Sequence, residues 1–424
     1  MSNNNKTPAI RFKGFTDTWE QRELGECMKT VTDYVAAGSF ADIADHVQYK
    51  NTPDYAQLIR TVDLKHEFRN NDYIYVDKKA FDYLWRVNLN EECIILPNIG
   101  ANIGEVYYIE PLSLPYEFNV LGPNAILLKT KDSTKFMFTL LQADDFQNKL
   151  YVSIASSGQP KFNKTELKSI KLLLPKPDEQ EKIGQYFAHI DNLITLHQRK
   201  CDKLIQFKAA MLQKMFPQNG ADKPEIRFKG FTDAWEQRKL GEVASNFEYG
   251  LNASAKEFDG KNKYIRITDI DDESRMFLSD DITSPDTDLT LADKFKLEAG
   301  DILFARTGAS VGKTYLYREK DGLVYYAGFL IRAKINSEND AEFVFQNTLT
   351  DSYNSFIRIT SQRSGQPGVN AQEYQGYNFY VPNLEEQKAI GTYFRNLDNL
   401  ITLHQRKCDK YKSIKAGLIR KLFP

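Results

Sequence analysis

The chain has 424 residues, of which 42% are hydrophobic, and its formal net charge is −1 at pH 7. This length can bury more than one core, and the balanced charge argues against a protein that coats nucleic acid through bulk charge. No apolar run is long enough to span a bilayer, and the first residues lack the apolar core of a signal peptide. Four cysteines, none at metal-site spacing from another, fit a reducing compartment. We therefore expect a cytoplasmic protein with no membrane partner.

The chain opens on a motif that returns later. Residues Ile10–Glu26 recur at Ile226–Glu242 with two differences, Thr18/Ala234 and Glu23/Lys239. A second repeat lies further along, where Asp191–Lys203 returns without a change at Asp398–Lys410. The chain is thus a tandem repeat.

Between these shared ends the two copies diverge and keep only a few landmarks. Gly100–Gly104 aligns with Gly308–Gly312, and the Ser-Gly-Gln-Pro run at Ser157 aligns with the one at Ser364. Short runs rich in β-branched and aromatic residues predict strands at Tyr73–Val76, Cys93–Leu96, Val106–Ile109, Ala125–Leu128, Ile170–Leu174, Tyr264–Ile270, Ile302–Arg306, Tyr315–Tyr317, Phe329–Ile335 and Tyr377–Val381. Helical stretches are fewer, near Phe136–Leu150 and Phe343–Ile359. We expect each variable region to be a compact, loop-rich α+β domain.

Each copy then ends in a predicted long helix. Apolar or seam positions fall alternately four and three residues apart, at 183, 187, 190, 194, 197, 201, 204, 208, 211 and 215, which is the period of a coiled-coil seam. Asp178 with Glu181, and Asn383 with Glu386, indicate a cap at the start of each helix. The predicted order is a variable domain at 1–176, a helix at 177–217, a second variable domain at 218–382 and a helix at 383–424.

Residues before Ile10 stand where a continuation of Pro424 would lie, so the repeat is effectively circular. Two long helices joined in this way pack most simply as an antiparallel coiled coil. The expected fold class is α+β, with two loop-rich domains separated by the helices in a pseudo-twofold arrangement.

The seam does not explain why the sequences at the centres of the two helices are identical, because a seam fixes only the inward-facing positions. Apolar side chains that lie off the seam widen the face of each helix, and we predict that they bind partner helices: Tyr186, Leu193 and Leu196, with Tyr393, Leu400 and Leu403. Two identical faces suggest two identical partners. The alternative is that a recent duplication left the copies alike for no physical reason.

The run Thr307–Thr314 resembles a phosphate-binding loop but lacks its first glycine, and the first copy has no lysine there. We therefore interpret the paired glycines as a turn between strands whose amides approach a phosphate backbone closely, or as a plain hairpin turn. His197 with Cys201, and His404 with Cys408, invite a zinc site. Antiparallel pairing would join the histidines but separate the cysteines, which favours a polar pair that sets the helix register.

No catalytic constellation emerges. Asp178 and Glu181 are too close together for the acidic elements of a nuclease, and we find no methyltransferase, hydrolase or zincin motif. We expect a non-enzymatic protein that needs no cofactor and no metal.

The arrangement resembles the specificity subunit of type I restriction-modification systems. The resemblance rests on the paired helix starts at Pro175 and Pro382, the two Ser-Gly-Gln-Pro segments, and the openings Trp-Glu-Gln-Arg-x-Leu-Gly-Glu at Trp19 and Trp235. It covers essentially the whole chain. It implies two target-recognition domains that each read half of a bipartite site in double-stranded DNA, with helices that space them and dock two modification subunits. Restriction subunits would join that core, and methyl transfer and ATP-driven cleavage would belong to those other chains.

The candidate DNA-binding residues lie on the shared landmarks and beside them. They are Arg60, Asn98, Asn102, Gln159, Lys161, Arg266, Arg306, Thr307, Ser310, Lys313, Arg363 and Gln366. Arginine suits guanine, asparagine and glutamine suit adenine, and lysine and turn amides suit phosphate. The main alternative function is a structural adapter whose two domains bind protein or sugar, and an enzyme with an unfamiliar site is a third.

Overall fold

The structure, a computed structural model, describes residues 8–69, 72–155, 160–218, 220–278, 280–362 and 365–423. It forms two compact units: the first comprises Met1–Leu196 with Lys407–Pro424, and the second comprises His197–Arg406. Each unit therefore holds one variable region, part of the long helix that follows it and part of the other long helix. Among the described residues, no helix is long and apolar enough to cross a membrane.

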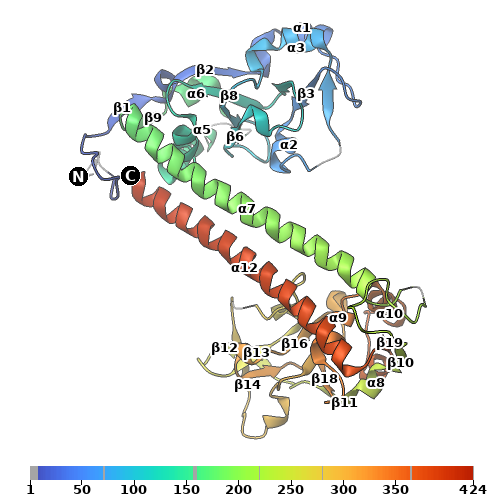
Figure 1. Cartoon of the computed structure of the whole chain (residues 1–424). Helices are drawn as coiled ribbons and strands as arrows, with labels where there is room; N and C mark the ends of the chain where they lie inside the picture. The colour runs from blue at the N-terminus through green and yellow to red at the C-terminus, as the bar shows by residue number, and fades with distance from the viewer. Residues whose placement is uncertain are drawn as a thin grey trace. The chain divides into compact units, whose positions relative to one another are not determined.

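The first unit is built on a four-stranded antiparallel sheet, in the order β2-β8-β5-β6, and a three-stranded sheet, in the order β4-β3-β7. Figure 1 labels β2, β8 and β6 of the first sheet and β3 of the second. Its strands are β1 (Glu20–Glu23), β2 (Met28–Asp33), β3 (Ala56–Ile59), β4 (Ile74–Val76), β5 (Cys93–Pro97), β6 (Tyr107–Ile109), β7 (Asn119–Leu121), β8 (Ala125–Thr130) and β9 (Lys171–Leu174). Its helices are α1 (Phe40–His46), α2 (Thr61–Lys65), α3 (Lys78–Tyr83), α4 (Thr134–Leu140), α5 (Asp144–Ala155), α6 (Lys164–Ser169) and the first part of α7 (Pro177–Met215).

The second unit repeats this plan. Its antiparallel sheet has the order β11-β18-β15-β16, and its second sheet, β12-β14-β13-β17, gains one strand at the edge. Its strands are β10 (Glu236–Lys239), β11 (Ala244–Tyr249), β12 (Ser254–Glu257), β13 (Lys263–Ile265), β14 (Thr283–Asp286), β15 (Asp301–Ala305), β16 (Thr314–Leu316), β17 (Val324–Tyr326), β18 (Leu330–Ile335) and β19 (Asn378–Val381). Its helices are α8 (Leu240–Val243), α9 (Ala341–Asn347), α10 (Asp351–Thr360), α11 (Ala371–Gln375) and the first part of α12 (Leu384–Leu422).

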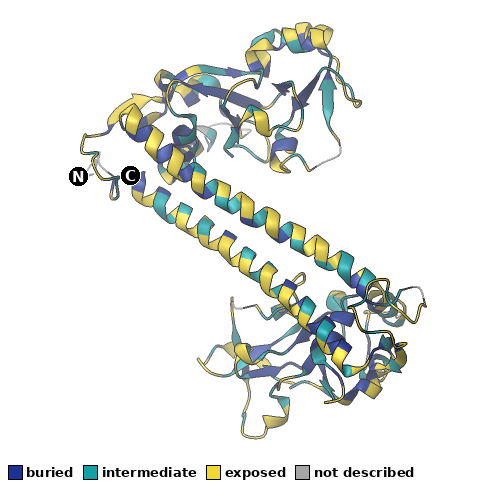
Figure 2. Ribbon diagram, viewed as in Figure 1, coloured by how far each residue is buried: buried dark blue, intermediate teal, exposed yellow. Residues whose placement is uncertain are grey.

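The α+β class and both long helices are confirmed, and the seam positions on α7 are all buried or half-buried. Figure 2 shows the alternation of buried and exposed residues along both helices. The predicted helices near Phe136–Leu150 and Phe343–Ile359 are each two short helices, because the chain turns after Leu140 and after Asn347.

The two long helices are antiparallel within each unit. In the second unit, Nδ1 of His197 lies 2.8 Å from Nδ1 of His404, and Lys208 donates to Asp398 at 2.6 Å. Residue numbers thus rise on α7 as they fall on α12. In the first unit, Lys415 lies 2.7 Å from Asp191. The predicted histidine pair is confirmed, and it is a polar contact within the seam.

The shared motifs of the sequence bond to one another inside each unit. Arg11 forks onto Glu179 with two bonds of 2.7 Å, and Arg227 forks onto Glu386 at 2.6 and 2.7 Å. The tryptophans of the two openings pack on the phenylalanines near the ends of the long helices. The Trp19 ring centroid lies 6.0 Å from that of Phe423, and the Trp235 centroid lies 6.4 Å from that of Phe216.

A glycine in each long helix lets a short helix of the domain approach its backbone. A Cβ atom on Gly391 would lie 2.3 Å from Oδ1 of Asp340, the residue that caps α9, and one on Gly184 would lie 2.6 Å from the amide nitrogen of Phe136. These positions are Gly-x-Tyr-Phe in both copies. The spacing of helix and domain therefore depends on the absence of a side chain there.

Changing Gly391 to alanine is expected to lower the free energy of unfolding by about 1–3 kcal/mol, because overpacking displaces the α9 cap. Gly417 also lies within α12, and no atom lies within 4 Å of a Cβ built on it. Gly417→Ala should therefore raise stability by roughly 0.5–1 kcal/mol through helix propensity. Urea unfolding of both variants measures the difference, and equal effects would contradict the close approach.

Candidate nucleic-acid interface

In the second unit, two loops meet at the end of β15. Gly308 and Gly312 have φ of 76° and 85°, in the left-handed region that favours glycine, so the chain turns sharply from β15 into β16. Gly308 donates its amide to Pro367 at 3.0 Å, and Val369 donates to the carbonyl of Arg306 at 2.9 Å. The loop after β15 is thereby fixed to the segment before α11. We call residues 306–310 with 365–369 corner 2.

The first unit contains the same construction. Gly100 and Gly104 have φ of 97° and 82°, and Phe162 donates its amide to the carbonyl of Asn98 at 3.3 Å. A β-bridge joins Ile99 to Lys161, as one joins Thr307 to Gly368 in corner 2. We call residues 98–102 with 160–162 corner 1. The alignment of landmarks made from the sequence therefore matches the backbone.

Asparagines fix the helix that follows each corner. Asn163 accepts from the amides of Thr165 and Glu166 at the start of α6, and Asn370 accepts from Glu373 at the start of α11. Each is a capping box that satisfies otherwise free amides. Both corners are thus held by backbone hydrogen bonds and a capped helix.

The side chains on the two corners differ. The amide of Arg306 donates to Phe329, and the amide of Asn98 donates to Asn124, so these residues occupy equivalent places. Strand register makes Asp33 the equivalent of Tyr249, because each lies opposite an isoleucine of the central strand. A cation with two aromatics in the second unit therefore replaces two asparagines and an aspartate in the first.

Most predicted site residues in the corners are accessible. Lys161 and Gln366 are exposed, and Asn102, Thr307 and Ser310 are half-buried. Asn98 donates its side-chain amide to the carbonyl of Phe162 at 3.1 Å, which leaves its oxygen as an acceptor. Gln159 and Arg363 lie outside the described residues.

Two predicted arginines are engaged inside the domains. Arg60 forks onto Asp63 at 3.0 and 2.8 Å and also donates to the carbonyl of Asp72. Arg266 forks onto Asp269 with two bonds of 2.8 Å. The bond to Asp63 raises the pKa of Arg60, and the bond to Asp269 raises the pKa of Arg266. Neither guanidinium presents a free fork to a base, so the geometry speaks against the predicted base contacts.

Lys313 is also engaged. Its side chain is 7% exposed, and its ammonium donates to the carbonyl of Ile270 at 3.1 Å and lies 2.5 Å from Asp272. A phosphate contact needs an accessible ammonium. The predicted phosphate contact therefore does not fit this position, where the lysine instead ties the loop after β13 to the corner 2 hairpin.

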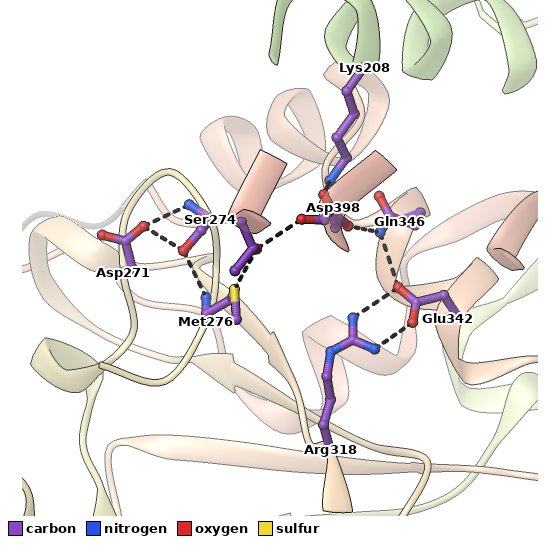
Figure 3. A network of polar contacts seen from close by, with 9 residues as sticks. Lys208, Asp271, Ser274, Met276, Arg318, Glu342, Gln346 and Asp398 are labelled. Atoms are coloured by element: carbon purple, nitrogen blue, oxygen red, sulfur yellow. Dashed lines mark hydrogen bonds and ion pairs between the residues drawn. The ribbon is translucent and has the colours of Figure 1, made fainter. Parts of the chain in front are cut away.

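A polar network joins the second domain to both long helices (Figure 3). Asp398 of α12 accepts from Lys208 of α7 at 2.6 Å and from Gln346 of α9 at 2.9 Å. Gln346 donates in turn to Glu342, which accepts the fork of Arg318 at 2.8 and 3.1 Å. These charges satisfy one another, so the network positions the domain on its helices.

The predicted partner-binding residues lie on the long helices. Leu196, Leu400 and Leu403 are 46%, 43% and 45% exposed, and Leu193 is half-buried. Tyr186 packs edge-on against Phe12, and Tyr393 packs in the same way against Phe228. The tyrosines therefore contribute to the fold of each unit, whereas three of the leucines are largely open to solvent.

Tyr249 and Phe329, the two aromatics beside Arg306, are not among the site residues predicted from the sequence. Their signal was the glycine next to each, in Tyr249-Gly250 and Gly328-Phe329. A Cβ atom on Gly250 would lie 2.2 Å from the carbonyl oxygen of Ala327, so this glycine permits the close approach that brings the two rings together.

A family model described as the type I restriction modification DNA specificity domain matches residues 16–206 and again residues 232–412. The chain belongs to this family. It is a type I restriction-modification specificity subunit with two DNA specificity domains, the recognition component of such a system and not its catalytic one. The resemblance inferred from the paired motifs is confirmed.

Named relatives agree with this assignment. The specificity subunit of the type I restriction enzyme MjaVIII of Methanocaldococcus jannaschii is 22% identical over 346 residues, 79% of each chain. The putative MjaX specificity subunit of the same organism is 23% identical over 423 residues, 96% of this chain and 93% of the relative. The crystal structure of the type I restriction-modification S subunit from M. genitalium has a similar fold, with a TM-score of 0.65, 15% identity and 99% coverage of both chains.

Proposed function

We propose that this specificity subunit reads an asymmetric, bipartite site in double-stranded DNA, with corner 1 on one half-site and corner 2 on the other. The observation that carries the proposal is the pairing of matched backbones with unmatched side chains in the two corners. Two readers of different sequences need the same placement but different donors and acceptors. An adapter that presents one ligand site twice should keep its loops alike.

The proposed DNA contacts are Asn98, Asn102, Gln159 and Lys161 in the first domain, and Arg306, Thr307, Ser310, Arg363 and Gln366 in the second. For Arg60, Arg266 and Lys313 we propose a scaffold role, because their donors already have partners inside the domains. Under this proposal the remaining groups divide between base edges and phosphates by type, with arginine and amide side chains on bases.

We further propose that two modification subunits dock on the long helices, one on the face of Tyr186, Leu193 and Leu196 and one on the face of Tyr393, Leu400 and Leu403. The exposed leucines support this proposal, since apolar helix faces gain free energy by burial against another helix. Restriction subunits would complete the assembly. The protein would act in the cytoplasm, where its DNA target lies.

Comparing adenine methylation across the genome of cells with and without this gene, in a host that supplies the modification subunits, tests the proposal. We expect a split motif whose two halves differ in sequence and which is methylated only when the gene is present. A palindromic motif would contradict two different readers. Unchanged methylation, together with no shift of duplex DNA by the purified complex, would favour the adapter.

A further inference from the structure

The guanidinium of Arg306 in corner 2 lies over two aromatic rings. Its carbon atom lies 5.0 Å from the ring centroid of Tyr249 and 5.9 Å from that of Phe329. The backbone of Arg306 is fixed on both sides, since its amide donates to Phe329 and its carbonyl accepts from Val369. The hydroxyl of Tyr249 accepts from the amide of Ala371 at 3.3 Å, which holds that ring in place. We call Tyr249, Arg306 and Phe329 the arginine stack.

The arginine stack has no acidic partner among the described residues. Three other arginines of the unit are paired with a carboxylate: Arg266 with Asp269, Arg318 with Glu342 and Arg332 with Glu248. Nε of Arg306 is buried and makes no hydrogen bond, whereas its two terminal nitrogens are not among the buried, unbonded atoms. A buried donor without a partner lowers the stability of the folded state, so holding this guanidinium over the rings costs free energy.

The rings that hold Arg306 are themselves open to solvent. Phe329 is 60% exposed and Tyr249 is 43% exposed. A stack that served only the core would bury its rings, as Phe304 and Tyr374 do in the same unit. A half-buried cation that lies over two exposed rings, on a glycine-containing corner, forms a surface that suits a flat polar ligand.

Arginine binds two kinds of group on DNA, backbone phosphates and guanine bases, and the two differ in how rigidly the guanidinium must be held. A phosphate accepts hydrogen bonds from many directions, so even the mobile point charge of a lysine binds it well. Guanine offers two acceptors in one plane, N7 and O6, which match the two terminal nitrogens of a fixed guanidinium. Stacking on rings restricts the guanidinium before DNA binds, so less conformational entropy is lost on binding.

We propose that the arginine stack reads a guanine in the half-site of the second domain, with Tyr249 and Phe329 as positioning residues that hold the fork of Arg306. This inference rests on the proposed function and extends it to a base and to two residues outside the predicted set. Corner 1 has Asn98, Asn124 and Asp33 at the equivalent places. The described part of corner 1 offers no arginine, so its half-site is read by different groups.

The experiment measures DNA methylation rates of the complete complex of this chain with its modification subunits. The methylated motif of the natural protein first defines both half-sites, and Asn98→Ala identifies the half-site of the first domain. Duplexes with each of the four bases at every guanine of the other half-site are then compared for the natural chain and for Arg306→Gln, Arg306→Lys, Phe329→Leu and Tyr249→Phe.

We expect Arg306→Gln and Arg306→Lys each to reduce discrimination at one guanine by about 10- to 100-fold. Glutamine pairs with adenine rather than guanine, and lysine carries a flexible point charge that lacks the planar fork and does not stack on the rings as a guanidinium does. Phe329→Leu should reduce discrimination at the same guanine less strongly. Tyr249→Phe should reduce it least, because it keeps the ring and loses only the hydrogen bond from the amide of Ala371. Complex formation, followed by native mass spectrometry, should be equal for all variants. The Asn98→Ala half-site should be unaffected by all of them.

Three results would overturn the assignment while leaving the proposed function intact. They are a second half-site without guanine, full discrimination in Arg306→Lys, which would indicate a phosphate contact, and loss of discrimination spread evenly over all positions. Failure of the proposed function has a different signature, since the natural protein would then give no bipartite motif at all.

Discussion

Replacing Glu386 by glutamine is expected to lower the free energy of unfolding by about 3 kcal/mol. The change leaves the largely buried guanidinium of Arg227 without its charged partner. Glu386 is fully buried and Arg227 is 15% exposed, with two bonds of 2.6 and 2.7 Å between them. The bond to Glu386 raises the pKa of Arg227, so the arginine stays charged at every pH at which the protein is handled. Removing one partner of such a pair costs far more than the pair contributes against an apolar replacement.

A matched control lies in the same unit. Glu236 pairs with Arg238 at 2.9 Å, but both side chains are exposed. Glu236→Gln should therefore change stability by no more than about 0.5 kcal/mol. Urea unfolding of the full chain compares the two variants, and because the chain has two compact units, the affected transition should be that of the second unit. Equal losses in both variants would show that the buried pair behaves like a surface pair.

This pair explains why the opening motif and the helix start are alike in both copies. Arg11 and Arg227 come from the openings, and Glu179 and Glu386 come from the first turns of the long helices. The next residue in each helix, Gln180 or Gln387, donates to the carbonyl of the proline before the helix at 2.9 Å. The repeated motifs therefore attach each domain to its long helix, and this structural role explains why they are alike in the two copies.

The helices and their pairing could be predicted from the sequence, because a regular seam and an exact internal repeat are both visible in one chain. The seam positions placed His197 opposite His404, and the two side chains are in contact. The short strands were harder to predict. Strands β1 and β10 carry only polar residues, all exposed except the half-buried Arg238, so they show no alternation of apolar and polar side chains.

The candidate site could be predicted only in part, because residue type does not reveal which partner a side chain already has. Residue type alone predicts that Arg60 and Arg266 contact DNA bases. An aspartate follows each arginine three residues later, however, and accepts the hydrogen bonds of its guanidinium. That spacing is visible in the sequence and indicates a scaffold role. Lys313 gave no such signal, since Ile270 and Asp272 reach it from a loop far away in the chain.

Changing Leu193 and Leu196 together to aspartate is expected to remove one of the two modification subunits that we propose to dock on the long helices. Leu196 is 46% exposed and Leu193 is half-buried, although the seam residues Ile183, Phe187 and Ile190 of the same helix are buried in the first unit's core. Burying a leucine against a partner stabilises a complex by roughly 1.5–3 kcal/mol, so loss of both weakens binding by at least about 100-fold. The specificity subunit itself should stay folded, because its seam and core are untouched.

Native mass spectrometry of the purified variant with excess modification subunit measures the result, which we expect to be a one-to-one complex in place of two-to-one. The equivalent change, Leu400→Asp with Leu403→Asp, should remove the other subunit, since these leucines are similarly exposed in the second unit. Asn192→Asp with Thr195→Asp adds the same two charges at neighbouring exposed positions of the same helix and serves as the matched control. If the control also loses a subunit, charge rather than apolar contact governs docking. If the leucine variant keeps a two-to-one complex, these leucines are not part of the docking face.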